Sequence, residues 1–275
     1  MKRCASVLIA VVMVCSAAGA FAENGTSEIE KVLGFASWLL GSTAKMQKRA
    51  QEEDDAYSAM MWMYNEANPA APNDVKEIAG LLTELGIDGI TAEHIGQTYD
   101  DAVRAEENGY VFSREMAALS LLCAAGMGTY DADFNWHPSS ETVMCLDMEL
   151  FGGETLYSSF FEGLNRICSG EFVFTDIRED YSDANLETGE GVIGLEFLVN
   201  GASYACSAVM MQDWFDMAVF DAVSDIAVDP DSGRRLYAMY DGMQGLIILY
   251  NTPEWAQRFE EATGCPLNTK MHYAY

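Results

Sequence analysis

The spacing of hydrophobic residues changes about halfway along the chain. Between residues 23 and 130 they recur mainly every three or four positions, which is the spacing of amphipathic helices. From residue 142 onward, segments with a period of two alternate with further helical segments. A period of two is typical of strands, because their side chains point alternately to opposite faces. The pattern predicts an α+β protein, with a helical domain over residues 23–130 and an α+β domain over residues 131–275.

Polar caps and glycines predict where the helices of the first part begin and end. Thr91 and Ser113 are suited to accept a hydrogen bond from the first turn of a helix. His94 stands three residues after Thr91, so this cap lacks the acidic partner of a full capping box. We expect a first helix from Ser27, a linker over residues 68–72, and then helices over Asp74–Leu85, Thr91–Glu107 and Ser113–Ala125, which end at Gly86, Asn108-Gly109 and Gly126.

The second part predicts the order β-α-β-β-β-α-β-β-α, with helices covering one side of a mainly antiparallel sheet. Residues 129–141 and 181–190 are polar and are expected to be loops. The expected strands are Thr142–Phe151, Glu171–Asp180, Gly191–Val199, Ala202–Met211, Leu236–Tyr240 and Leu246–Tyr250, and the expected helices are Glu154–Cys168, Asp213–Ile226 and Pro253–Ala262. The unbroken apolar run of Leu246–Tyr250 predicts a central strand.

Several boundaries in this part have a local stereochemical reason. Asn200-Gly201 is the preferred pair for a type I′ hairpin turn, because both residues tolerate positive φ. A second hairpin is expected around Asp241-Gly242, and Asp213 is expected to cap the following helix by accepting a bond from the Asp216 amide. The closing helix has Thr252 as its N-cap, Pro253 at its first position and Gly264 just after its end.

The predicted order also contains β-α-β-β twice. The apolar spacing of the two helices agrees as well, since Phe160-Phe161, Leu164 and Ile167 match Val219-Phe220, Val223 and Ile226. This agreement raises the hypothesis of a duplicated α+β unit, next to the alternative of coincident helical spacing.

The N-terminus has the features of a secretory signal peptide. Residues 1–22 combine the basic Lys2 and Arg3, an apolar core, and small residues at Ala20 and Ala22. We expect cleavage after Ala22 and a secreted, extracytoplasmic protein; lipidation at Cys15 is an alternative. Because no later apolar run is long enough to span a bilayer, we expect no direct membrane insertion after cleavage.

Acidic residues greatly outnumber basic ones. The formal net charge is −28, from 43 Asp and Glu against 15 Lys and Arg. Such a charge repels phosphate backbones and anionic lipids, which argues against a nucleic-acid partner. Cationic partners and divalent metal ions are compatible with it, and the acidity by itself also favours solubility.

Cysteine usage excludes two common kinds of site. Five cysteines follow the signal peptide, and none forms a C-x-x-C pair of the kind used for zinc or redox chemistry. Their odd number and wide spacing do not indicate a disulfide framework. Cys168 and Cys265 each follow a predicted helix end, so this pair is the first disulfide to test.

One polar segment partly matches a calcium-binding loop. Asp131, Asp133 and Asn135 occupy the first, third and fifth positions of an EF-hand-like loop, where oxygen ligands converge on Ca²⁺. Trp136 stands where the turn needs glycine, and Thr142 stands where the bidentate glutamate belongs. The segment is therefore either a weak Ca²⁺ site or a polar linker.

Two groups of side chains are candidates for catalysis. Asp147 and Glu149 share one strand face, at about 6.5 to 7 Å, and would adjoin Asp176 on the next strand if the two strands were neighbours. Arg178, Asp180 and Glu196 would then lie on the same face, which is alternatively a solvated sheet surface with cross-strand pairs. The second group is Cys145 with His137 and Asp147, as nucleophile, base and orienting carboxylate.

Motifs of other enzyme classes are absent from the sequence. There is no G-x-S-x-G nucleophile elbow and no G-x-x-x-x-G-K-[ST] phosphate loop. Our first hypothesis is an exported, non-enzymatic module that binds a protein or peptide. The alternative is a secreted hydrolase that uses the strand carboxylates or the cysteine–histidine pair.

Overall fold

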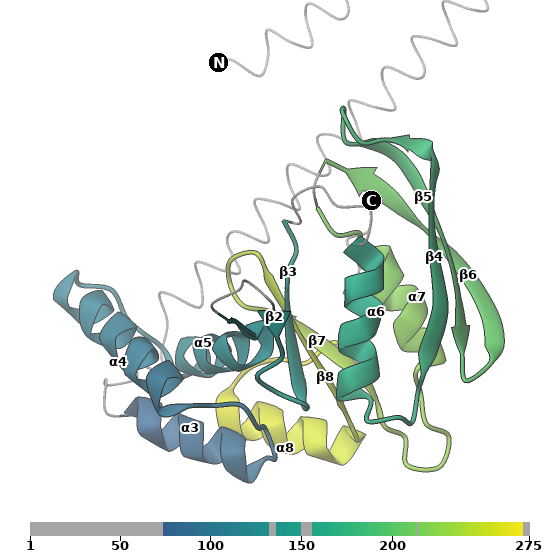
Figure 1. Ribbon diagram of the computed structural model, residues 1–275. Coiled ribbons are helices and arrows are strands. Elements are labelled where there is room, and N and C mark those ends of the chain that lie inside the picture. Colours follow the sequence, from purple (N-terminus) through teal and green to yellow (C-terminus); the bar gives the residue numbers. More distant parts are fainter. Residues whose placement is uncertain (1–73, 132–135, 150–155, 213, 272–275) are drawn as a thin grey trace, which may run out of the picture. The chain divides into compact units, whose positions relative to one another are not determined.

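Helices and antiparallel sheets together confirm the predicted α+β class (Figure 1). The computed structural model describes residues 74–131, 136–149, 156–212 and 214–271. The signal peptide, the helix expected from Ser27 and the linker over 68–72 lie outside these residues. Everything described belongs to one unit, residues 60–273. The boundary expected at residue 130 falls inside this unit, and the division into two domains stays a prediction.

The helices before the first strands begin at the predicted caps. They are α3 (Asp74–Glu84), α4 (Ala92–Glu107) and α5 (Arg114–Met127), and the side chains of Thr91 and Ser113 cap α4 and α5. The capping box of α4 is complete, contrary to the expectation. The His94 amide donates to Thr91 Oγ1 at 3.2 Å, and His94 Nδ1 accepts from the Thr91 amide at 3.4 Å. A ring nitrogen therefore replaces the expected carboxylate.

Gly126 lies inside α5, although the sequence predicted that the helix ends there. The helix continues to Met127, and Gly128, with φ of +76°, follows its end. A Cβ atom on Gly126 would lie 2.5 Å from the Cys145 amide nitrogen. Glycine is therefore needed here because it allows the helix to lie against the backbone of a strand.

That strand is the edge of a three-stranded antiparallel sheet in the order β3-β8-β7. The strands are β3 (Val143–Asp147), β8 (Gly245–Asn251) and β7 (Arg235–Tyr240), so the predicted central position of the apolar run is confirmed. Helices were expected on one side of the sheet, but side chains from both faces are buried. This explains why β8 is apolar at successive positions.

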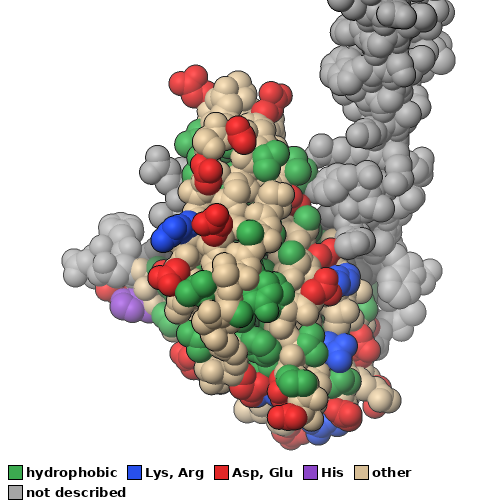
Figure 2. Space-filling model, turned by 90° about the vertical axis from the view of Figure 1, so that its right-hand side faces the viewer, with side chains coloured by type: hydrophobic (Ala, Val, Ile, Leu, Met, Phe, Trp, Pro, Cys, Tyr) green, Lys and Arg blue, Asp and Glu red, His purple; other side chains and the backbone are tan. Residues whose placement is uncertain are grey.

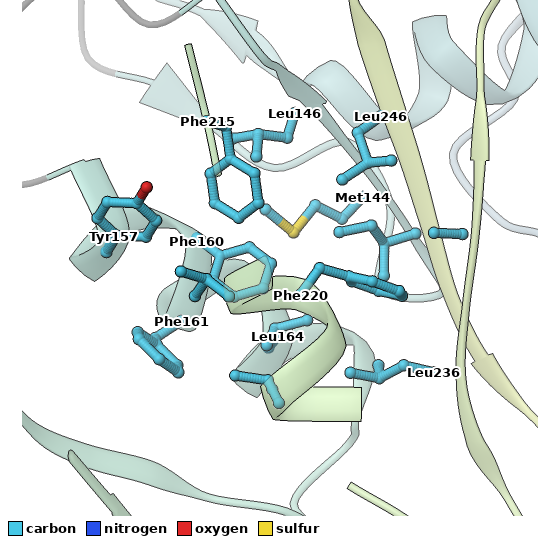
Figure 3. Packing of buried hydrophobic residues seen from close by; sticks show 14 of the residues in the cluster. Met144, Leu146, Tyr157, Phe160, Phe161, Leu164, Phe215, Phe220, Leu236 and Leu246 are labelled. Atoms are coloured by element: carbon cyan, nitrogen blue, oxygen red, sulfur yellow. The ribbon is translucent and has the colours of Figure 1, made fainter. Parts of the chain in front are cut away.

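A separate hydrophobic core lies on each face of this sheet. On one face, α6 (Leu156–Ile167) and α7 (Met217–Ile226) lie between the sheet and a second sheet (Figure 1). In Figure 3, side chains of both helices and of the sheet surround Met144. On the other face, α3, α5 and the closing helix α8 (Pro253–Thr263) cover the strands. The labelled residues of the first core are Met144, Leu146, Tyr157, Phe160, Phe161, Leu164, Phe215, Phe220, Leu236 and Leu246.

The second sheet has the order β4-β5-β6 and is also antiparallel. Its strands are β4 (Phe174–Asn185), β5 (Glu190–Val199) and β6 (Ala202–Met211). Residues 181–185 were predicted to be a loop but belong to β4, and only residues 186–189 form the turn. Polar side chains on both faces hide the strand period here. The register also shifts between Thr175 and Arg178 and again between Asp180 and Asp183.

Three of the four predicted boundary signals are confirmed, and one of these is the hairpin around Asp241-Gly242, which joins β7 to β8. Asn200 and Gly201 have φ of +50° and +84°, as the type I′ turn between β5 and β6 requires. Thr252 Oγ1 accepts from the Trp255 amide at 3.2 Å, and Gly264, with φ of +77°, ends α8. The predicted cap at Asp213 is wrong, because α7 begins at Met217 and is capped by Asp216. The polar segment 129–141 also contains a short ribbon of β1 (Thr129–Tyr130) and β2 (Trp136–His137).

From β3 onward the element order is the predicted β-α-β-β-β-α-β-β-α. The two sheets also correspond under the proposed repeat. If β3, β4 and β5 correspond to β6, β7 and β8, then the order β3-β8-β7 corresponds to β6-β5-β4. Each half contributes its first strand to the hairpin of the other half. This exchange is the arrangement that a duplicated unit would give, and the duplication itself stays a prediction.

Candidate functional site

The strand carboxylates do not gather on one sheet face. Asp147 ends β3, and its Oδ1 accepts bonds from the Glu149 amide at 3.0 Å and from Gln244 Nε2 at 3.4 Å. Asp176 lies in β4, in the other sheet, where its φ is +51°. Since β3 pairs with β8 and β4 pairs with β5, the two predicted groups are not neighbours.

Within β4 and β5 the expected cross-strand arrangement is present. Arg178 stands opposite Glu196, and Asp180 stands opposite Gly194. Hydrogen bonds from Ser182, its amide first and then its side chain, lower the pKa of Asp180. These side chains fit the solvated sheet surface that was the alternative to a catalytic cluster.

The members of the cysteine–histidine group contact other partners. Cys145 is buried in β3, and its Sγ lies 3.0 Å from Cys123 Sγ on α5. His137 is exposed on β2, and its Nε2 lies 3.0 Å from Asp131 Oδ2. The observed contacts therefore join a cysteine with a cysteine and a histidine with a carboxylate.

The predicted calcium loop is described only in part. Asp131 pairs with His137, while Asp133 and Asn135 lie outside the described residues. Within the residues that are described, no three His, Cys, Asp or Glu side chains are grouped so that they could hold a metal ion.

The predicted Cys168–Cys265 pairing is wrong. Cys168 belongs to the core between the two sheets, whereas Cys265 belongs to the core under α3, α5 and α8. The β3-β8-β7 sheet separates these cores, and both thiols are free. Burial raises the pKa of each thiol to about 12. Both are therefore buried as protonated apolar side chains.

None of the helices in the described ranges has the length and apolar character that a membrane span requires.

An open sheet edge is the feature that best fits a site. The two edges of the β4-β5-β6 sheet differ in how they are protected. On β4, Asn165 of α6 bonds both the amide and the carbonyl of Phe174, and two register shifts interrupt the strand. Bulges and charged side chains are known devices against unwanted strand pairing. The other edge, β6, pairs with β5 over ten consecutive residues and has no register shift, no proline and no charged side chain.

The backbone of β6 shows which groups face the open side. The Val209 amide donates to Asp216 Oδ2 at 2.7 Å, and the Met211 carbonyl accepts from the Trp214 amide at 3.2 Å. Both bonds point away from β5, so odd-numbered residues direct their backbone groups outward. Residues 214–216 thus cover the end of the edge. The amides and carbonyls of Ser203, Ala205 and Ser207 face outward in the same way, without a partner among the described residues.

The side chains around this edge are small or apolar. Val192 and Val209 stand opposite each other on the outer face and are 40% and 52% exposed. Tyr204 is 37% exposed and stacks on the buried Phe197 with a ring separation of 6.2 Å. An incoming strand would therefore find apolar contacts as well as unpaired backbone groups.

The sheet that carries this edge is acidic. Residues 174–211 contain seven carboxylate side chains, and Arg178 is their one basic side chain. Figure 2 views the molecule from the side on which this sheet lies in Figure 1, and it shows hydrophobic side chains among many acidic and few basic ones. A cationic ligand would therefore be attracted to this side of the molecule.

Comparison of the chain with family models, with curated proteins and with solved structures gave no match. The candidate site is thus defined by its own geometry. Sequence reasoning predicted β6 as a strand but gave no sign that it is an edge, because strand order is a property of the folded chain.

Proposed function

We propose that this protein is an exported, non-enzymatic module that binds an extended, cationic segment of a partner protein along β6. The bound segment adds a fourth strand to the β4-β5-β6 sheet. The observation that carries the proposal is the open edge at Ser203, Ala205 and Ser207. The opposite edge of the sheet, β4, is interrupted by register shifts and bonded by Asn165.

Strand addition matches the groups that the edge offers. Each outward residue presents one amide and one carbonyl, and these main-chain bonds supply affinity in this mode of recognition. Their number is limited because the bonds of Val209 and Met211 with residues 214–216 already occupy the far end of the edge. The bound segment is therefore short, about five or six residues.

Charge selects the partner. An added strand lies about 5 Å from β6 and about 10 Å from β5, which places its side chains within about one Debye length of Glu190 and Glu196. Lysine and arginine side chains are long enough to shorten this distance further. The same field disfavours a second copy of the chain, since two acidic sheets would have to meet.

Synthetic peptides test this proposal. The probe is a fluorescent octapeptide of alternating lysine and valine, measured by anisotropy with the purified chain. We expect binding that Ala205→Pro weakens about tenfold or more, because proline removes an outward amide and blocks close approach. Ala205→Thr keeps the amide and is the matched control, with an affinity close to that of the unchanged chain.

Backbone bonding is separated from charge by two further peptides. The same octapeptide with every backbone amide methylated keeps its charge and should lose most of its affinity. A glutamate–valine octapeptide keeps its amides and should bind least. Equal binding of the methylated peptide would refute strand addition. Dimerisation in sedimentation, abolished by Ala205→Pro, would show that a second copy occupies the edge.

A further inference from the structure

Two cysteines from different elements lie side by side. Cys123 Sγ on α5 is 3.0 Å from Cys145 Sγ on β3, and the residues are 22 positions apart in sequence. A disulfide bond is about 2.05 Å long, so the sulfur atoms need to approach by about 1 Å. Cys145 is buried, whereas Cys123 is partly exposed.

The backbone around this pair is tightly packed. Gly126, one turn after Cys123, allows α5 to lie against β3, because a Cβ atom there would be 2.5 Å from the Cys145 amide nitrogen. Cys145 itself stands opposite Ile247 of the central strand, within the core under α3, α5 and α8. The two sulfur atoms therefore approach each other from a helix and a strand that the fold already holds together.

We propose that Cys123 and Cys145 form an intramolecular disulfide when the chain meets a disulfide donor, and that this bond ties α5 to β3. The Cys123 thiolate attacks one sulfur of the donor, which forms a mixed disulfide and releases the first donor thiol. Cys145 then attacks the Cys123 sulfur and releases the second donor thiol. Two protein thiols are oxidised, the donor disulfide is reduced to two thiols, and the two cysteine protons leave on those thiols.

The surroundings assign the first attack to Cys123. The hydrogen bond with Cys123, burial and the nearby charges of Asp241 and Asp147 raise the pKa of the Cys145 thiol well above its usual range. Cys123 is the more accessible sulfur, 3.7 Å from Asp241 Oδ2. Asp241 also lines a cleft of about 250 Å³ together with Ser120 and Met243, so the cleft adjoins a residue that contacts Cys123.

The other cysteines of the described chain are not alternative disulfide partners for Cys123 or Cys145. Cys168 lies in the other core, and Cys265, although in the same core as Cys145, has its Sγ 3.7 Å from the Glu115 carbonyl. Burial raises the pKa of the Cys265 thiol to about 12 and that of the Cys206 thiol to about 11. The five cysteines of the described chain therefore comprise one neighbouring pair, Cys123 with Cys145, and three single thiols. If the signal peptide exports the chain, the chain reaches compartments in which disulfides form and persist.

Mass spectrometry of the full chain tests the proposal. The protein is equilibrated with oxidised glutathione, alkylated, digested without reductant and mapped. We expect the Cys123 and Cys145 peptides to be joined, with Cys168, Cys206 and Cys265 alkylated after unfolding. The oxidised chain should melt about 5–10 °C higher than the reduced chain. Cys206→Ser is the matched control and should show the same rise, while Cys123→Ser should show none.

Three results would overturn the proposal. One is that Cys123 and Cys145 are both alkylated after equilibration with the donor. Another is glutathione retained on Cys123 without the internal bond. The third is a link that joins different cysteines. The mapping is made on the unchanged chain, so its result does not depend on the folding of any variant.

Discussion

At the scale of single residues, Asp216 joins three elements. Its Oδ1 accepts from the Ala218 amide at 2.9 Å and so caps α7, while its Oδ2 accepts from the Val209 amide on β6 at 2.7 Å. The Asp216 amide donates to Tyr157 Oη of α6 at 3.2 Å. This one buried carboxylate therefore starts a helix and covers part of the β6 edge.

Removal of this carboxylate should destabilise the fold. We expect Asp216→Ala to lower the free energy of unfolding by about 2–4 kcal/mol, because a helix cap is lost and the Val209 amide loses its acceptor. Asp216→Asn keeps one oxygen and should cost less. Urea denaturation measures both changes. If Asp216→Ala and wild type unfold at the same urea concentration, these bonds do not stabilise the protein.

Asp88 makes the stability of the folded protein depend on pH. Its carboxylate accepts bonds from Ser140 Oγ, from Thr142 Oγ1 at 2.7 Å and from the amides of Glu141 and Thr142. Burial opposes ionisation, but the hydrogen bonds outweigh it and lower the pKa of Asp88. A lowered folded-state pKa stabilises the protein above the unfolded value of about 4, and this contribution disappears as pH falls through the folded-state value.

Asp88→Asn tests this dependence. Because Asp88 is exposed, the variant should lower the free energy of unfolding at pH 7 only slightly, by about 1 kcal/mol. The difference between wild type and variant should shrink as pH falls below about 4, since the carboxylate then becomes protonated. Unfolding measured by urea at several pH values gives this difference. If the difference in unfolding free energy between wild type and variant grew as pH fell, the lowered pKa of Asp88 would be contradicted.

At the scale of elements, close packing of α5 on β3 depends on Gly126. We expect Gly126→Ala to lower the free energy of unfolding by about 1–3 kcal/mol, because the added methyl group meets backbone atoms of Met144 and Cys145. Gly96→Ala in α4 is the matched control. No atom lies within 4 Å of a Cβ there, so alanine should stabilise the helix by about 0.5–1 kcal/mol. Thermal denaturation of both variants checks the opposite signs.

The sequence allowed the order of the elements to be predicted, because the necessary signals are local. Asn200-Gly201 needs positive φ, and Thr252 with Gly264 marks both ends of α8. The extension of β4 through residues 181–185 was missed, since its polar side chains show no apolar period. The N-cap of α7 is Asp216 and not the predicted Asp213, because both aspartates precede the helix and offer similar local signals.

The candidate site was harder to predict, because it depends on which strands become neighbours. Alternation correctly placed Asp147 and Asp176 on strands, but those strands pair with different partners. It likewise gave no sign that Ala202–Met211 would form an edge or that Cys123 would meet Cys145. These relations are long-range and have no counterpart in spacing along the chain.

At the scale of the whole molecule, the net charge of −28 should govern how a cationic segment arrives. We expect the affinity for the lysine–valine octapeptide to fall several-fold between roughly 50 and 300 mM salt, because screening weakens attraction over the distance to β5. A threonine–valine octapeptide should show little change. Anisotropy titrations at both salt concentrations measure the difference. Equal salt dependence of the two peptides would exclude electrostatic selection.

Amide hydrogen exchange along β6, followed by NMR with and without the lysine–valine octapeptide, is the most direct measurement. Strand addition predicts slower exchange at Ser203, Ala205 and Ser207, whose amides face outward. It predicts little change at Tyr204, Cys206 and Ala208, which already face β5. Protection of the second set alone, or equal exchange with and without peptide, would contradict binding at this edge.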